Sequence, residues 1–378
     1  MNTDSSNVYT RYAGELAGLE ASNNLRHLPV IEDDSLINLA SNDYLAINDN
    51  KELINSFLSS YQWNSHSMSS VSSRLLTGNH KEYQLLERCL DNFLPGRRSL
   101  VFTGGFHANQ GIMQALMGKN DLIIADKLSH ASIIDGLRLT EATVLRFRHN
   151  DMTHLEHILS DNRSKYDSCM IVTEGIFSMD GDIAPLQQIA QLKEKYNALL
   201  YVDEAHSFGI RGRDGRGICD ELGVLNKVDL LMCTLGKAIG STGAFVSTND
   251  TIRNYLINKC RTIIFTTALP PVNCAWTRHI IEHLSDPKMN EARANLKAMA
   301  EKLSLAINGK VGESQIIPYI TGDVNLAIEK CNDLREHGFY ALPIRYPTVA
   351  KGTERIRLSL KANITENQVN EIINILSH

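Results

Sequence analysis

The chain has 378 residues, of which 43% are hydrophobic and 21% are charged, and its formal net charge at pH 7 is −5. This balance is ordinary for a globular protein, and the length allows roughly two domains of about 100–200 residues each. A slightly acidic chain gives no reason to expect nucleic acid or an anionic membrane surface as a partner. No apolar run approaches the roughly 18–20 residues that span a membrane, so no membrane segment is expected.

The seven cysteines are scattered along the chain, and no two of them form a C-x-x-C pair. That spacing favours reduced thiols in a cytoplasmic protein over a disulfide framework or a metal site. The first residues are polar and acidic, which argues against a secretory signal peptide. We therefore expect a cytoplasmic protein that holds no metal.

The N-terminal part of the chain predicts an arm followed by a polar loop. Apolar residues at helical spacing between positions 8 and 26 predict an amphipathic helix that ends near Ala21, and a short strand is expected over 36–40. We assign residues 1–45 to this arm. The serine-rich stretch 63–80 is typical of a loop, and a helix is expected after it.

Residues 46–270 predict a large α/β domain. Short apolar runs alternate there with segments of helix length, and the runs lie at 100–102, 122–125, 143–145, 170–172, 199–202, 230–232 and 244–246. Runs that do not alternate with polar residues are typical of strands buried on both faces. A mostly parallel central sheet with helices on both faces is therefore expected.

Residues 271–378 follow a different pattern and predict a smaller C-terminal α+β domain. The segment 353–360 alternates strictly between apolar and polar residues, which places Arg357 on the face opposite the core. The last helix opens with Thr365 and, three residues later, Gln368, a capping-box pattern.

Polar residues follow several of the predicted strands, at the sheet edge where ligands bind in such folds. Gly104, Gly105 and Phe106 open a helix after the first run, and free amides at a helix N-terminus can bind a phosphate. The pattern is not G-x-G-x-x-G, so a dinucleotide is not indicated. A plain tight turn fits these glycines equally well.

Lys237 lies in a glycine-dense turn directly after the apolar run 228–233. Lysine is almost never buried, so its position next to a buried strand needs an explanation. One explanation is an exposed lysine at a strand-to-loop corner. The other is a desolvated amine with a lowered pKa that forms a Schiff base with a carbonyl group.

Asp203 ends an apolar strand, where an unpaired carboxylate would be costly to bury. A protonated pyridine nitrogen would compensate this charge, and so would an arginine or a turn that the carboxylate caps. His206 follows three residues later and could ligate a metal. No second histidine stands four residues on, however, and the H-E-x-x-H order is absent.

His130 and Arg357 each allow a functional and an ordinary interpretation. The imidazole of His130 could stack on an aromatic ring or be a structural group, and Arg357 could bind a carboxylate through two hydrogen bonds or be exposed. Taken together, the candidates supply a phosphate cup, an acid for a ring nitrogen, an imidazole for the ring face and a lysine for an aldehyde. Pyridoxal 5′-phosphate (PLP) is the cofactor that needs this set.

Three longer motifs identify a family. The runs 173–182 (TEGIFSMDGD), 203–207 (DEAHS) and 236–240 (GKAIG) resemble the α-oxoamine synthases, PLP enzymes of the aspartate-aminotransferase fold. Further matching runs lie at 41–45, 73–80, 146–151, 347–349 and 352–357, so the resemblance extends over essentially the whole chain. It implies the PLP-dependent transferase fold type I.

The resemblance also implies roles for the residues around the cofactor ring. Lys237 would hold PLP as a Schiff base and later move the Cα proton of the substrate. Asp203 would keep the pyridine nitrogen protonated, and His130 would stack on the ring. His206, together with Ser178, would lie near the ring hydroxyl.

The same resemblance implies how the phosphate is held. Gly105, Phe106 and Thr234 would hold it within one chain. Thr266 and Thr267 resemble the segment that reaches the phosphate of the neighbouring subunit. A homodimer with shared active sites follows from this.

For the substrate, the resemblance implies that Arg357 binds the amino acid carboxylate and that Arg26, Asn42 and Thr348 make further contacts. The closest likeness is to the branch that condenses L-alanine with a pimeloyl thioester, carried by CoA or acyl carrier protein, in biotin biosynthesis. Glycine-using members and non-catalytic subunits of the fold are the alternatives. Residues 65–72 lack the glycines usual in the family, which predicts a different loop path or an altered acyl-chain entrance.

Overall fold

The computed structural model describes residues 9–30, 33, 35–65 and 67–377. Its main element is a seven-stranded sheet with the order β2-β8-β7-β6-β5-β3-β4. The strands are β2 (Arg98–Phe102), β3 (Leu122–Asp126), β4 (Thr143–Phe147), β5 (Cys169–Glu174), β6 (Leu199–Asp203), β7 (Leu230–Thr234) and β8 (Ala244–Thr248). All seven predicted runs are strands. Only β8 pairs antiparallel, with β2 and β7, so the sheet is mostly parallel as expected.

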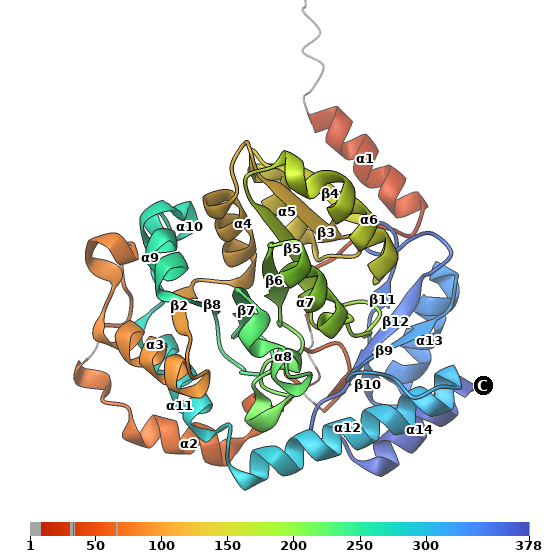
Figure 1. The fold of residues 1–378 in the computed structure, drawn as a ribbon. Helices are drawn as coiled ribbons and strands as arrows, with labels where there is room; N and C mark the ends of the chain where they lie inside the picture. The colour runs from red at the N-terminus through yellow and green to blue at the C-terminus, as the bar shows by residue number, and fades with distance from the viewer. Residues whose placement is uncertain (1–8, 31–32, 34, 66, 378) are drawn as a thin grey trace, which may run out of the picture.

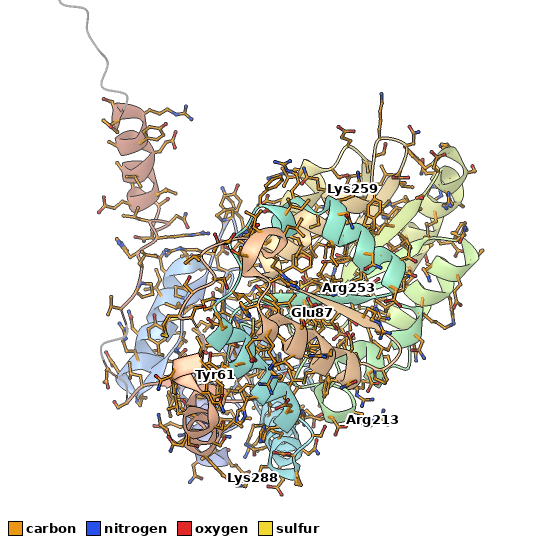
Figure 2. All side chains as sticks on the ribbon, turned by 90° about the vertical axis from the view of Figure 1, so that its left-hand side faces the viewer. Tyr61, Glu87, Arg213, Arg253, Lys259 and Lys288 are labelled. Atoms are coloured by element: carbon orange, nitrogen blue, oxygen red, sulfur yellow. The ribbon has the colours of Figure 1, made fainter. Side chains whose placement is uncertain are left out.

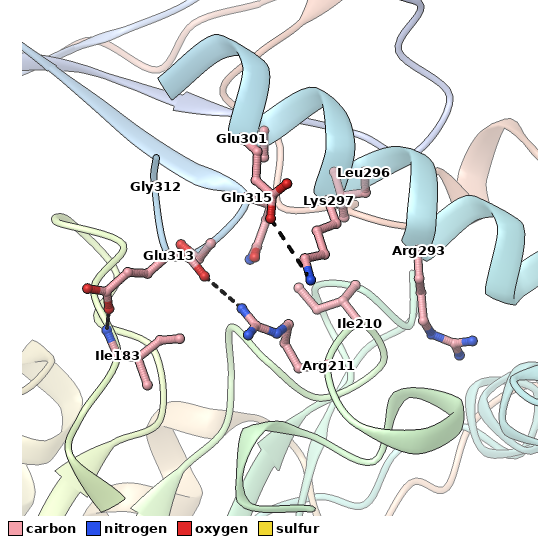
Figure 3. Close-up of a pocket in the computed structure, with 12 residues that line it drawn as sticks. Ile183, Ile210, Arg211, Arg293, Leu296, Lys297, Glu301, Gly312, Glu313 and Gln315 are labelled. Atoms are coloured by element: carbon pink, nitrogen blue, oxygen red, sulfur yellow. Dashed lines mark hydrogen bonds and ion pairs between the residues drawn. The ribbon is translucent and has the colours of Figure 1, made fainter. Parts of the chain in front are cut away.

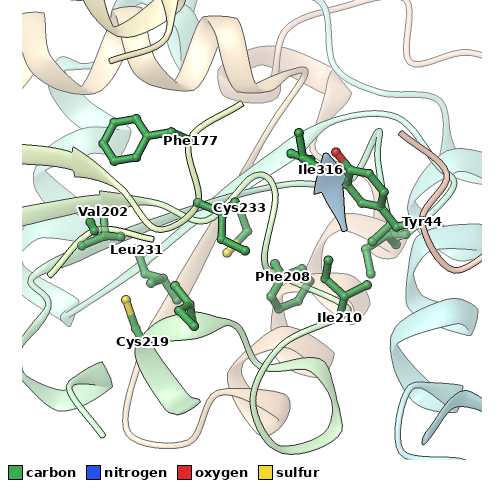
Figure 4. Packing of buried hydrophobic residues seen from close by; sticks show 14 of the residues in the cluster. Tyr44, Phe177, Val202, Phe208, Ile210, Cys219, Leu231, Cys233 and Ile316 are labelled. Carbon is green, nitrogen blue, oxygen red and sulfur yellow. The ribbon is translucent and has the colours of Figure 1, made fainter. Parts of the chain in front are cut away.

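Both faces of this sheet are buried, because neighbouring residues of one strand enter different apolar clusters. In β5, Ile171 belongs to one cluster, whereas Met170 and Val172 belong to the other. Figure 4 shows part of the first cluster, where Val202 and Leu231 lie near each other. The helices of this region are α3 (Lys81–Phe93), α4 (Gly105–Leu116), α5 (Ala131–Leu139), α6 (Met152–Asn162), α7 (Leu186–Lys195), α8 (Ile218–Glu221), α9 (Asp250–Lys259), α10 (Arg261–Ile264) and α11 (Pro271–His283).

The C-terminal region forms a second, three-stranded antiparallel sheet with the order β11-β12-β9. Its elements are α12 (Pro287–Asn308), β9 (Ile316–Ile320), α13 (Val324–Glu336), β11 (Pro343–Ile344), β12 (Arg355–Ser359) and α14 (Glu366–Ser377). Figure 1 shows it beside the large sheet. The predicted capping box is present, because the Thr365 amide donates to Gln368 Oε1 at 2.9 Å and the Gln368 amide donates to Thr365 Oγ1 at 3.3 Å.

One face of β12 differs from the sequence-based expectation. All five residues of this strand are buried, and Arg357 is only 8% exposed. The alternative of an ordinary exposed arginine is therefore wrong. The reason is that the loop 177–183 covers the polar face of the strand, with Arg357 Nε donating to the Ser178 carbonyl at 2.5 Å.

The N-terminal region contributes a helix, α1 (Tyr9–Ala21), and a short strand, β1 (Ile37–Asn38), which pairs parallel with β10 (Phe339–Tyr340). Residue 8, part of the predicted amphipathic pattern, lies outside the described residues. The helix ends where expected, but it buries no residue within the chain and projects from the body (Figure 1). The division of the chain at residues 45 and 270 stays a prediction.

Helix α2 (Lys51–Ser60) leads into the serine-rich stretch, which contains a short 3₁₀ turn, Trp63–Ser65, and a π-helical turn, Arg74–Gly78. Arg74 Nη1 donates to Glu87 Oε1 at 2.8 Å, and Arg253 Nη2 donates to Glu87 Oε2 at 2.8 Å. Glu87 and Arg253 are labelled in Figure 2. A buried carboxylate with two guanidinium partners is well compensated, so it joins the π-helical turn to α3 and α9.

Candidate active site

A cavity of about 510 Å³ opens at the carboxyl ends of β5, β6 and β7. It gathers seven of the predicted site residues with five others, and its lining is Gly105, Phe106, Asn109, His130, Ser132, Glu174, Asp203, Ala205, His206, Met232, Thr234 and Lys237. The parallel strands bring these side chains to one edge of the sheet, as the fold requires.

Lys237 follows β7, and its amine faces inward. Its Nζ lies 2.7 Å from His206 Nε2. Burial lowers the pKa of the Lys237 ammonium to about 8, although the nearby carboxylates of Asp203 and Glu174 oppose this shift. The surface-lysine alternative is therefore wrong, and a substantial part of this amine is neutral at mildly alkaline pH.

Both ring nitrogens of His206 contact protein groups. Its Nε2 meets Lys237, and its Nδ1 lies 2.6 Å from Tyr44 Oη. Burial, with the positive charge of Lys237 next in size, holds the pKa of His206 well below its usual value, so the imidazole is neutral. With both nitrogens engaged in this way, the metal-ligand interpretation of His206 has no geometric support.

Asp203 presents a buried carboxylate, 4% exposed, to the cavity. Its Oδ2 accepts a hydrogen bond from Asn109 Nδ2 at 2.9 Å, and its Oδ1 accepts one from the Ala205 amide at 2.9 Å. Among the described residues, no lysine or arginine forms an ion pair with it. A buried anion of this kind fits a cationic ring nitrogen in the cavity, which agrees with a PLP site.

Glu174 is a second buried carboxyl group in this cavity, and sequence reasoning gave it no role. It lies opposite Asp203 in the ladder of β5 and β6 and is 2% exposed. Burial raises the pKa of Glu174 well above its usual value, and the charge of Asp203 raises it further. Glu174 thus favours its neutral form.

His130 stands at the N-terminus of α5 and caps this helix. Its Nδ1 accepts a hydrogen bond from the Ser132 amide at 3.2 Å, and its own amide donates to Glu174 Oε1 at 2.5 Å. Burial lowers the pKa of His130. These contacts fix a neutral imidazole in the cavity wall, where an aromatic ring could lie against it.

The start of α4, which lines the same cavity, suits a phosphate. Gly105 is the first residue of α4, and a Cβ added there would lie 3.8 Å from Thr234. Free amides at the start of this helix can bind an anion. Thr266 and Thr267 do not line the cavity of their own chain. They follow Phe265, whose side chain is 68% exposed.

The predicted substrate residues fall into two groups. Asn42 Oδ1 accepts hydrogen bonds from Arg357 Nη2 at 3.2 Å and from Tyr44 Oη at 2.9 Å. Arg26 Nη2 donates to Thr348 Oγ1 at 3.1 Å, and both residues are exposed and outside the cavity lining. The structure therefore joins Arg357 and Asn42 to the Lys237 site through Tyr44, and it places Arg26 and Thr348 together elsewhere.

Sequence reasoning missed Asn109, Tyr44 and Gln315. Asn109 lies four residues after Gly105, one helical turn further, and a polar residue at that spacing was a usable signal. Tyr44 lies in the run 41–45, which matches the family, but sequence reasoning gave this residue no role of its own. Gln315 Nε2 donates to the His206 carbonyl at 3.0 Å, and nothing in the linear sequence indicates that contact.

A second cavity, of about 710 Å³, lies between large-sheet loops and α12 (Figure 3). Arg211 Nη1 donates to the Glu313 carbonyl at 2.7 Å, and the Ile183 amide donates to Glu313 Oε2 at 2.8 Å. Segment 312–315 thus joins the C-terminal region to loops beside the first cavity.

Comparisons with known proteins agree with this geometry. A family model described as "Aminotransferase class I and II" matches residues 34–376. A Pasteurella multocida protein named "Putative 8-amino-7-oxononanoate synthase" is 44% identical over 377 residues, covering 96% of this chain and 97% of its own. A Haemophilus influenzae protein of the same name is 43% identical over 373 residues and covers 95% and 98% of the two chains.

Solved structures give the same result. A serine palmitoyltransferase from S. paucimobilis with bound PLP and myriocin has a TM-score of 0.89 and 27% identity, covering 99% of this chain and 98% of its own. An 8-amino-7-oxononanoate synthase from Francisella tularensis has a TM-score of 0.75 and 32% identity, with coverages of 91% and 98%. The fold is the predicted fold type I, and the cofactor is PLP. The chain belongs to the class I and II aminotransferase family and, within it, to the α-oxoamine synthases.

Proposed function

We propose that this protein condenses L-alanine with a pimeloyl thioester, with loss of carbon dioxide, to give 8-amino-7-oxononanoate for biotin synthesis. The names of the curated relatives at 43–44% identity support this choice of substrates. The observation that carries it is the half-buried Lys237 amine, 2.7 Å from a neutral His206, in one cavity with the Asp203 carboxylate. The seven free cysteines suit a reducing compartment, so we propose the cytoplasm as its location.

PLP supplies an aldehyde for the substrate amine and a cationic ring that takes up the electron pair left at Cα. In this proposal Asp203 faces the ring nitrogen, and His130 lies against the ring. His206 and Ser178 lie near the ring hydroxyl. Gly105, Phe106 and Thr234 hold the phosphate at the start of α4, and their support is the shared cavity lining.

Lys237 is the group we assign to proton transfer at Cα. Its pKa of about 8 lets the amine take a proton near neutral pH and return it later in the cycle. The neutral His206 next to it accepts a hydrogen bond from the ammonium, and Tyr44 holds the other side of the ring.

Arg357 is the group we assign to the amino acid carboxylate. Its guanidinium is fixed by Ser178, Ser359 and Asn42, at 2.5, 2.6 and 3.2 Å, which leaves it oriented before substrate arrives. We assign Asn42 to the same carboxylate. Arg26 and Thr348, which bind each other across the arm and the C-terminal region, are assigned to further substrate contacts on the family resemblance.

We also propose a homodimer in which Thr266 and Thr267 reach the phosphate site of the second subunit. Large apolar side chains in this part of the surface support it. Phe265 is 68% exposed, Leu76 is 78% exposed and Val71 is 85% exposed. Such a surface is typical of one that a partner covers.

Turnover of the PLP-loaded protein with L-alanine and pimeloyl-CoA or pimeloyl-acyl carrier protein, read by mass spectrometry, tests the proposal. We expect 8-amino-7-oxononanoate with at least one of the two donors. Residues 65–72, which lack the glycines usual in the family, make the choice of donor an open part of the experiment. A loaded protein that turns over neither donor would contradict the proposal.

A second candidate is a family reaction with a different amino acid. The high structural similarity to a serine palmitoyltransferase favours including it, with a TM-score of 0.89. The same assay with glycine and L-serine, and with shorter and longer acyl thioesters, separates the two candidates. Faster turnover of glycine or L-serine than of L-alanine would favour the second.

A further inference from the structure

The loop 177–183 connects the large sheet to the C-terminal region. On one side, three of its polar groups face that region. The Ser178 carbonyl accepts from Arg357 Nε at 2.5 Å, Asp180 Oδ1 accepts from Arg355 Nη1 at 2.6 Å, and the Gly181 carbonyl accepts from Ser314 Oγ at 2.7 Å. The orientation of Arg357 therefore depends on where this loop lies.

On its other side the loop is held by His149, which follows β4. His149 Nε2 lies 2.7 Å from Asp182 Oδ2, and Nδ1 lies 2.9 Å from Asp126 Oδ1 at the end of β3. The imidazole also meets the Phe177 ring edge-on, with 4.4 Å between the centroids. One side chain thus connects a buried strand end to both ends of the loop.

Asn150 reinforces the same link. Its backbone is in the left-handed region, with φ 51°, which lets its amide donate to Asp126 Oδ2 at 3.0 Å. Its side chain donates to Asp182 Oδ2 at 2.8 Å. A left-handed conformation at a residue with a Cβ is uncommon and is kept where surrounding contacts favour it.

The charges of this cluster are complementary. The groups facing the imidazole are the Asp126 carboxylate from β3 and the Asp182 carboxylate from the loop, and Asp126 is fully buried. Burial lowers the pKa of His149, but the hydrogen bonds and charges of the two carboxylates outweigh it and raise the pKa to about 10. The imidazolium therefore donates to both carboxylates at neutral pH.

We infer that His149 is a positioning residue for the amino acid carboxylate. Held on Asp126, it fixes Asp182 and the loop 177–183, and the Ser178 carbonyl of that loop orients the Arg357 guanidinium. The inference rests on the proposed role of Arg357. A guanidinium must meet a carboxylate in a narrow geometry for two parallel hydrogen bonds, so a displaced loop weakens substrate binding without removing any group that touches substrate.

The test uses the PLP-loaded protein and two variants, His149→Gln and a matched control, His157→Gln. His157 pairs with Asp161 at 3.5 Å on the exposed side of α6. It is therefore a histidine paired with a carboxylate that is not part of the loop 177–183. L-Alanine binding is read from the cofactor absorbance, and KM is measured for both substrates. We expect His149→Gln to raise the Kd and KM for L-alanine about tenfold and the KM for the thioester less than about twofold. The control should match the wild type.

Failure of the inference can be told from failure of the proposed function. If wild-type protein does not bind L-alanine, the proposed function is wrong. If wild type binds L-alanine and His149→Gln binds it equally well, or if both KM values rise together, the inference is overturned.

If His149→Gln does not fold, Asp182→Asn tests the same link, because it removes the charge and keeps the shape of the side chain. It should raise the KM for L-alanine selectively. An unchanged KM for L-alanine in Asp182→Asn, or an equal rise of both KM values, would overturn the inference.

Discussion

Two histidines at the same edge of the sheet have opposite electrostatic environments. His206 lies between Lys237 and Tyr44, and burial keeps its pKa far below the usual value. His149 lies between two carboxylates, and its pKa rises to about 10. The first is a neutral acceptor beside the Lys237 amine, and the second is a cation at neutral pH that contacts the loop 177–183. The comparison teaches that a histidine's partners, rather than its place after a strand, decide what it does.

The largest effect is expected when the partner of the neutral histidine, His206, is removed. Lys237→Ala removes the amine that pairs with His206 and should lower turnover by roughly a thousandfold or more. Steady-state assays with L-alanine and the pimeloyl thioester measure it. Lys259→Ala, an exposed lysine on α9, serves as the control. Retention of a tenth of wild-type activity by Lys237→Ala would contradict the assignment.

Arg357→Lys tests the residue that is linked to both histidines, to His206 through Tyr44 and to His149 through the loop 177–183. The lysine keeps the charge but loses the fork that binds a carboxylate through two hydrogen bonds and also contacts Ser178. We expect the KM for L-alanine to rise by about 10- to 100-fold, measured with the thioester at saturation. Arg213→Lys is the control. An unchanged KM would remove Arg357 from the carboxylate site.

The pH dependence of cofactor binding probes the lowered pKa of Lys237. Only the neutral amine reacts with an aldehyde, so the rate at which PLP bonds to the cofactor-free protein should rise with pH and level off above about pH 8. An ordinary lysine would level off near 10.5. Stopped-flow absorbance measures the rate, and a midpoint near 10 would show that the amine is not desolvated.

The smallest effect is the contribution of the cationic histidine, His149, to the free energy of unfolding. The folded-state pKa of His149, about 10, exceeds the ordinary value of 6.5, so its stabilising contribution is full below about pH 6.5 and is lost as the pH rises through about 10. The free energy of unfolding of wild type should exceed that of His149→Gln by on the order of 1–2 kcal/mol at pH 6.5 and by little above pH 10. Urea titrations across this range measure the difference. A constant difference would contradict an imidazolium.

The sequence predicted the fold well because strands that are buried on both faces of a sheet appear as uninterrupted apolar runs. All seven runs of the large sheet became strands, and the capping box of α14 formed as expected. Lys237, Asp203 and His206 could be singled out because each lies at or shortly after a strand end, where the fold places its ligands.

Other contacts depend on strand order, which the linear pattern does not contain. Asp126 and Asp182 meet at His149 only because β3 lies between β4 and β5. The alternation of β12 correctly separated its two faces. It could not show that a loop far away in the sequence covers the face of Arg357.

The hydrogen-bonded series Lys237, His206, Tyr44 and Arg357 has a mechanical consequence. The first two groups belong to the large sheet, whereas Arg357 belongs to the C-terminal sheet, and a single phenol bridges them at 2.6 and 3.2 Å. Any hinge motion that moves these sheets apart must break that bridge. The continuous contact from the Lys237 amine to the C-terminal sheet therefore exists only while the two sheets keep this arrangement.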